Sequence, residues 1–160
     1  MLRASILVVA ACVAFFPFVA HADEKPRTLM SRLGEWMYPD AAMTGASMSD
    51  AATVDSHGER TVPSIHCKAV LTTSAPIDQV VAYYKTKLAK RSPGGGGSSS
   101  NQEGRSVTFH SDSEGRPVAV HVISVIAERT STTLVISRAE SEVETHIAWS
   151  QYEGFDVQKK

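Results

Sequence analysis

The chain has very little cysteine, which limits how it can be held together. Only two of its 160 residues are cysteines, Cys12 and Cys67. Because Cys12 lies in an N-terminal segment that we expect to be removed, Cys67 is left alone and an intramolecular disulfide is excluded. A lone cysteine within an apolar strand is expected to be a small buried core residue. The fold must therefore be held by packing and hydrogen bonds.

Neither sign of charge dominates the chain, and aromatic residues are few. There are 16 Lys and Arg against 17 Asp and Glu, a formal net charge of −1, and 7% aromatic residues. A nucleic-acid-binding surface needs a basic face or a stacking motif, and neither stands out. We expect no nucleic-acid partner.

The usual signatures of catalysis and cofactor binding are missing from the sequence. No G-x-S-x-G motif is present, and the glycine run at 94–97 follows a predicted helix without the Gly-Lys-Ser/Thr of a phosphate-binding loop. His66 and Cys67 are neighbours in a predicted strand, so they point to opposite faces. No pair has metal spacing such as H-x-x-x-H or C-x-x-C. We expect no metal site, no cofactor and a non-catalytic protein.

The N-terminal segment has the pattern of an export signal. Residues 1–22 carry one positive charge at Arg3, an apolar run over residues 6–19, and the small-x-small ending Ala20-His21-Ala22. This pattern predicts cleavage before Asp23, export to the periplasm or the cell exterior, and no stable membrane anchor afterwards.

Two alternatives to a cleaved signal are an uncleaved membrane anchor and a lipoprotein. A transmembrane anchor is disfavoured because the apolar run is shorter than about 20 residues and contains Pro17. The stretch Val9-Ala10-Ala11-Cys12 resembles the lipobox at which bacterial lipoproteins are cut and acylated. Apolar residues follow Cys12, whereas a lipoprotein tether is usually polar, so a lipoprotein anchored through Cys12 is the minor alternative.

Residues 23–160 are predicted to form a single domain organised around one strong amphipathic helix. Ile77, Val80, Val81, Tyr84 and Leu88 fall on one stripe of a helix. We expect Ser74 to be its N-cap and Pro76 to lie in its first turn, where a missing N–H costs little. The stripe must lie against the strands predicted elsewhere in the chain.

The segments before this helix predict a short helix and two strands. Helical spacing over residues 28–37, with Thr28 as N-cap, predicts an N-terminal helix. Strands are expected at 43–54 and 60–72, joined by a glycine-containing hairpin, with the second interrupted at Pro63 because proline cannot donate to a ladder.

The segments after the helix switch to strand periodicity. Pro93 to Gly104 is rich in glycine and serine and predicts a flexible loop. Alternating residues then predict strands at 105–109, 117–127, 132–138 and 145–152. The order predicts an α+β fold: an antiparallel sheet of five or six strands, one main helix across it and a short N-terminal helix.

The strand at 117–127 is apolar on both sides. Val118, Val120, Val122 and Ile126 share one face, while Ala119, Ile123 and Val125 share the other, which predicts a central strand that is partly covered on both faces. If Phe109 shares a face with Val118, His110 lies opposite Pro117 and His121 opposite Ser106, too far apart to share a metal ion.

Three residues are the candidates for a ligand-binding site. Tyr83 lies one position off the buried stripe and has no evident packing role. Ser74 lies where the backbone amides of a helix N-terminus point outward. His121 would join them if the sheet curls around a pocket. No residue is assigned a catalytic or metal-binding role.

Several short stretches resemble a known group. They are Trp36-Met37-Tyr38-Pro39-Asp40-Ala41, Thr72-Thr73 before Pro76, Val80-Val81-Ala82-Tyr83-Tyr84 and Thr145-His146-Ile147-Ala148-Trp149-Ser150. Together these stretches look like small uncharacterised exported proteins of the planctomycete type. That group has no assigned activity, so the resemblance implies export but carries no functional residue to this chain.

Two functional hypotheses follow from these observations. The first is an exported non-catalytic module that binds a protein partner or a small apolar ligand at a sheet face, motivated by the two-sided apolar strand. The second is a small hydrolase or isomerase with a pocket between the helix and a curled sheet, using His121 or His146 with a tyrosine.

Overall fold

The computed structural model of the chain describes residues 28–90 and 104–155. The predicted signal at 1–22, with its Cys12 alternative, lies outside the described residues, as does the predicted loop at 93–104 except for Gly104. No described helix is long and apolar enough to cross a membrane.

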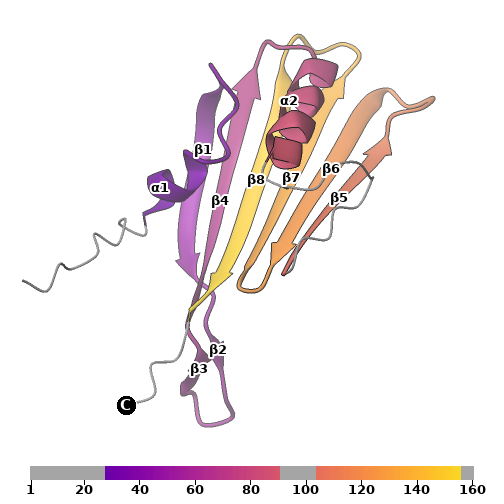
Figure 1. The fold of residues 1–160 in the computed structure, drawn as a ribbon. Coiled ribbons are helices and arrows are strands. Elements are labelled where there is room, and N and C mark those ends of the chain that lie inside the picture. The colour runs from indigo at the N-terminus through magenta and orange to yellow at the C-terminus, as the bar shows by residue number, and fades with distance from the viewer. Residues whose placement is uncertain (1–27, 91–103, 156–160) are drawn as a thin grey trace, which may run out of the picture.

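The fold is α+β, as predicted, with one six-stranded antiparallel sheet, one main helix and one short N-terminal helix (Figure 1). The sheet order is β1-β4-β8-β7-β6-β5, and β2 and β3 form a separate hairpin. The bounds are α1 Leu29–Leu33, β1 Ala42–Asp50, β2 Thr53–Val54, β3 Arg60–Val62, β4 Ser64–Thr73, α2 Ile77–Lys90, β5 Arg105–Asp112, β6 Val118–Ala127, β7 Thr130–Ala139 and β8 Thr145–Gly154.

Helix α2 forms where the apolar stripe predicted it and lies across one face of the sheet. Val80, Val81, Tyr84 and Leu88 are all buried, while Ile77 is partly buried at the start of the stripe. They pack on side chains that alternate along the central strands, as strand geometry requires. These sheet residues are Cys67, Ala69, Leu71, Ile123, Leu134, Ile136, Ile147 and Trp149. Cys67 is thus a buried core residue, as predicted.

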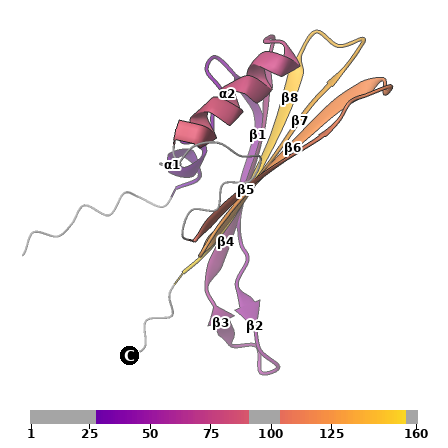
Figure 2. The same cartoon turned by 45° about the vertical axis from the view of Figure 1, so that its right-hand side comes forward.

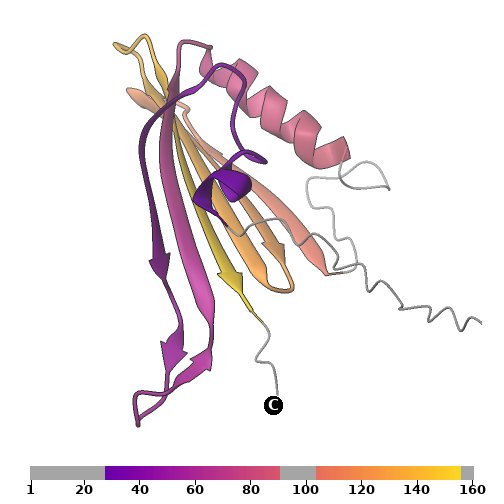
Figure 3. The same cartoon turned by 90° about the vertical axis from the view of Figure 1, so that its left-hand side faces the viewer.

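Helix α1 covers the same face as α2, as the side views show (Figures 2 and 3). Thr28 is its N-cap, in a capping box with Ser31. Leu33 and Trp36 join the core. The guanidinium of Arg32 forms an ion pair with Glu153 at the end of β8: Nη2 donates to Oε1 at 2.8 Å, and Nη1 lies 2.7 Å from Oε2. The predicted helix over residues 28–37 is shorter than expected, and turns follow Leu33.

The two faces of the sheet therefore differ. We call the face under the two helices the covered face, and the other, over which no described helix lies, the open face (Figure 2). Open-face side chains of the central strands alternate with the core residues along β4, β8, β7 and β6. They include Val70, Val118, Ile126 and Tyr152, which are all exposed.

Three local predictions are corrected by the structure. The register of the β5–β6 hairpin places Phe109 opposite Ile123 and His110 opposite Val122, because the turn and its flanking residues span more of the chain than a tight hairpin. His110 and His121 therefore point to opposite faces. Strand β6 is second from the edge and is covered on one face only.

Candidate functional site

The open face carries an apolar row that runs across four strands. Val122 of β6 lies opposite Val135 of β7, which lies opposite Ala148 of β8, which lies opposite Val70 of β4. Neighbouring side chains in register on one face of a sheet touch one another. The row thus forms a continuous apolar strip on a surface that the described residues leave uncovered.

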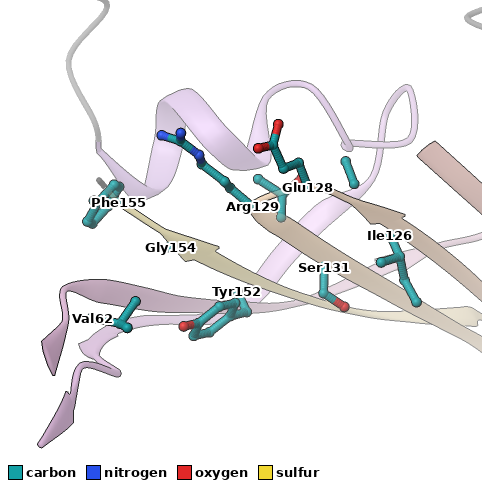
Figure 4. A pocket seen from close by; sticks show the side chains of 10 residues that line it. Val62, Ile126, Glu128, Arg129, Ser131, Tyr152, Gly154 and Phe155 are labelled. Carbon is teal, nitrogen blue, oxygen red and sulfur yellow. The ribbon is translucent and has the colours of Figure 1, made fainter. Parts of the chain in front are cut away.

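A pocket of about 370 Å³ opens where the lower ends of β6, β7 and β8 meet β3. We call it the foot pocket. Figure 4 shows Ile126, Ser131 and Tyr152 on the open-face side, with Val62 across from Tyr152. Its lining residues are Val62, Ile126, Ala127, Glu128, Arg129, Thr130, Ser131, Tyr152, Gly154 and Phe155. The pocket is thus a hollow at one end of the open face.

Backbone bonds at the end of β8 fix the walls of the foot pocket. The Gly154 amide donates to the carbonyl of Arg129 in the β6–β7 turn at 2.9 Å, and the Phe155 amide donates to the carbonyl of Pro63 at 2.8 Å. Pro63 interrupts the β3–β4 strand, as the sequence predicted, so that Val62 belongs to a separate hairpin. The phenol oxygen of Tyr152 lies 3.8 Å from the position where a Cβ on Gly154 would stand.

Four of the lining residues are polar or charged, Glu128, Arg129, Thr130 and Ser131, and a buried serine lies close by. Ser64 pairs with Gly154 on the open face, and its side chain is only 3% exposed. Its hydroxyl has no hydrogen-bond partner among the described residues, which is costly for a buried polar group. Glu128 and Arg129 lie on the turn and project to the opposite side of the ribbon from Tyr152 (Figure 4). The lining contains no histidine or cysteine.

Tyr83, the first predicted site residue, has a structural role that its position off the stripe did not reveal. Its hydroxyl donates to the carbonyl of Met37 at 3.3 Å and accepts from Lys87 at 3.2 Å. Its ring meets Tyr38 edge to face at 5.1 Å and Tyr84 at 5.2 Å. Tyr83 thus fastens α2 to the segment after α1, and the prediction that it lacked a packing role was wrong.

Ser74 lies outside helix α2, so the predicted N-cap position was wrong. The helix begins at Ile77, and the carbonyl of Pro76 accepts from the amides of Gln79 and Val80. Pro76 therefore occupies the position expected of Ser74. Ser74 is exposed in the bend before it, where Thr73 accepts a bond from the amide of Ala75 at 3.3 Å.

His121 lies on the covered face, beside the flank of α2 that faces β5. Its Nδ1 is 2.8 Å from the Ser111 hydroxyl on the neighbouring strand. Burial lowers the pKa of His121; the charge of Asp78 opposes this shift and that of Lys85 adds to it. Tyr83 is five residues from Asp78, which places it on the other flank of the helix. Tyr83 and His121 therefore do not share a site.

The other histidines are spread over the molecule. His66 and Ser150 form a hydrogen bond of 2.8 Å on the open face, His146 lies 3.7 Å from Glu142, and His57 and His110 are exposed. Tyr84 donates to the carbonyl of Trp36 at 2.7 Å, and burial raises its pKa. Within the described residues, no three His, Cys, Asp or Glu side chains gather as a metal site.

The residues of the foot pocket were missed by the sequence-based search. Tyr152 is the last residue of the strand predicted at 145–152, and Phe155 lies beyond it. The alternation in β8 does place Tyr152 on the face opposite Ile147 and Trp149. That signal predicts an aromatic side chain on the open face, but it does not predict that the β6–β7 turn and Val62 would enclose it.

Comparison with known proteins adds little. No family model matches the chain, and no curated protein matches it. Among solved structures, the chain resembles CalU16 from Micromonospora echinospora at 11% identity, covering 69% of this chain and 71% of that one, with a TM-score of 0.34. A likeness of that quality supports no conclusion about function.

Proposed function

We propose that the protein is an exported, non-catalytic module that binds a small apolar ligand in the foot pocket at the open face of its sheet. The observation that supports this most directly is the pocket itself, a hollow of about 370 Å³ with apolar and aromatic walls. Ligand pockets of proteins begin at about 300 Å³ and combine mostly apolar walls with a few polar groups.

The chemistry of the walls favours binding over reaction. Val62, Ile126, Tyr152 and Phe155 supply apolar or aromatic surface. Ser131 and the phenol of Tyr152 add polar groups to this surface, which suits a ligand with one polar group at the end of an apolar body. The lining contains no histidine, the commonest general base, that would activate Ser131 as a nucleophile.

The hydrolase or isomerase alternative has less support. It requires a tyrosine beside His121 or His146. The hydroxyls of Tyr83 and Tyr84 instead bind the carbonyls of Met37 and Trp36. The contacts of His121 are with Ser111 and with the flank of α2 that Tyr83 does not occupy.

Titration with the uncharged fluorescent apolar probe N-phenyl-1-naphthylamine tests the proposal with two matched variants. Ile126→Lys places a charge in the foot pocket, while Val118→Lys places the same charge on the same face of β6 at its other end. Both side chains are exposed, at 54% and 39%, so neither change disturbs the core. We expect saturable binding to the wild type, a Kd about tenfold higher for Ile126→Lys, and a wild-type Kd for Val118→Lys.

Two outcomes would overturn the proposal: no saturable binding to the wild type, or equal weakening by both variants. Circular dichroism and a denaturant titration of each variant establish that the probe reports on a folded protein, because this dye also binds partly unfolded states.

A further inference from the structure

The two edges of the sheet are built differently, and β1 carries fewer of the features that discourage pairing with another strand. Edge strands are usually protected by charges, prolines or bulges. Strand β5 carries Arg105 and Asp112 at its ends, and Asp112 forms an ion pair of 3.0 Å with Arg116. Strand β1 has no charged residue and no proline before its last position, Asp50, and its bulge between Met43 and Gly45 lies outside the segment from Ala46 to Ser49.

Strand β1 is also exposed along its whole length. All nine of its residues are exposed, including Met43 and Met48 at 44% and 49%. It pairs with β4 on one side, and within the described residues no strand lies on its other side. A long, uncharged, exposed edge of this kind is a template for the addition of another strand.

The outward backbone groups of β1 can be assigned from the ladder with β4. The amide of Ala51 donates to the carbonyl of Ser64 at 3.0 Å, so Ala51 belongs to a hydrogen-bonded pair. Such pairs alternate along an antiparallel ladder, which directs Ser47 and Ser49 toward β4 as well. The backbone groups of Ala46 and Met48 therefore point away from the sheet, where another strand would bind them.

We infer that β1 is an association edge that pairs antiparallel with β1 of a second copy of the chain. A two-fold axis through Ser47 places Ala46 opposite Met48 of the second copy, so that the outward groups of both strands meet. The same axis keeps Asp50 away from Asp50 of the second copy, and Asp50 is already engaged with Arg60. The all-antiparallel sheet then continues through both copies, with the helices on one side.

The second copy is favoured over a foreign peptide by the composition of β1. The methionines of β1 lie on the covered face among small residues, so a second copy of the strand fits beside them without steric conflict. The strand is uncharged over these residues, so two copies do not repel each other. A charged foreign strand would find no complementary charge between Ala42 and Ser49. Because a single strand pair buries little surface, we expect the dimer to be weak and to dissociate at low protein concentration.

Sedimentation velocity from micromolar to near-millimolar concentration tests the inference on the purified protein. Ala46→Lys places a charge at the centre of β1, and Thr108→Lys places the same charge on the exposed face of β5, the other edge. We expect a monomer–dimer equilibrium for the wild type and for Thr108→Lys, and a dimer Kd about tenfold higher or more for Ala46→Lys.

Hydrogen exchange on the wild type gives a second readout that needs no variant. The amides of Ala46 and Met48 should exchange more slowly at high than at low concentration, while the amide of Ser47, already bonded to β4, should not change. A wild type that stays monomeric at every concentration overturns the inference. So does equal weakening by Ala46→Lys and Thr108→Lys, or protection that develops on β5 instead of β1.

Discussion

The covered and open faces are made by alternate residues of the same strands, yet the side chains of one face are buried and many of those on the other are exposed. On β4, Leu71 is 0% exposed under the helices while its neighbour Val70 is 43% exposed on the open face. On β8, Trp149 is buried and Tyr152 is exposed. Backbone pairing is shared by both faces, so the difference lies in what packs above each. The core is one-sided, and the open face retains apolar groups whose burial the described fold does not require.

The largest expected effect separates the two faces at adjacent positions of one strand. Leu71→Ala should lower the free energy of unfolding by about 2–5 kcal/mol, because it leaves a cavity under the helices. Val70→Ala should lower it by less than about 1 kcal/mol, because the methyl groups it removes are already partly in water. Chemical denaturation of both variants and the wild type measures the difference.

A large loss of unfolding free energy in Val70→Ala would contradict the expected difference between the two faces. It would mean that the open face is packed in solution, either by residues outside the described ranges or by a second molecule. Repeating the measurement at several protein concentrations separates these causes, since only packing by a second molecule depends on concentration.

The second prediction concerns pH and the buried tyrosine. Burial raises the pKa of Tyr84, with smaller contributions from Tyr83 and Tyr38. In the unfolded chain a tyrosine ionises near pH 10, at about its reference value. Above that pH the unfolded state loses a proton that the folded state keeps, so the free energy of unfolding falls as the pH rises. The limit from this one group is about 1.4 kcal/mol per pH unit.

Tyr84→Phe isolates this contribution. At pH 7 the variant should lose about 1 kcal/mol, because the carbonyl of Trp36 loses its buried donor. Above pH 10 its stability should fall less steeply with pH than that of the wild type. Denaturant titrations at three pH values on each side of that point measure both slopes. Tyr152→Phe, on the open face, removes a phenol without touching the buried bond. If its slope matched that of Tyr84→Phe, the assignment to Tyr84 would be wrong.

Periodicity predicted the covered face well. The stripe from Ile77 to Leu88 and the alternation around Ile147 both depend on burial under helices, and both were confirmed. Pro63 was correctly predicted to interrupt a strand, since its missing donor acts locally. In each case the local pattern, residue spacing or a proline, agrees with the contacts that the segment makes in the folded protein.

The site was harder to predict because it depends on contacts between distant segments. Tyr83 was assigned no packing role, but its partner Met37 lies 46 positions earlier in the chain. The foot pocket joins Val62, the β6–β7 turn and Phe155, which only the strand order brings together. The β5–β6 register was predicted wrongly because β6 is apolar on both faces, so its alternation does not decide which of the two faces it shares with Phe109.

The smallest expected effects compare two serines on the open face whose hydroxyls differ in hydrogen bonding. Ser64 is buried beside the foot pocket with no partner for its hydroxyl among the described residues, whereas Ser150 bonds His66 at 2.8 Å. Ser64→Ala removes an unsatisfied buried group, so it should raise the free energy of unfolding of the ligand-free protein by up to about 1 kcal/mol. Ser150→Ala leaves His66 without its partner, so it should lower that free energy by about 0.5–1.5 kcal/mol. Changes of opposite sign in the free energy of unfolding, measured by denaturant titration, would establish that an unsatisfied hydroxyl destabilises the foot of the open face but not its middle. A loss of stability in Ser64→Ala would show instead that the hydroxyl has a hydrogen-bond partner in solution.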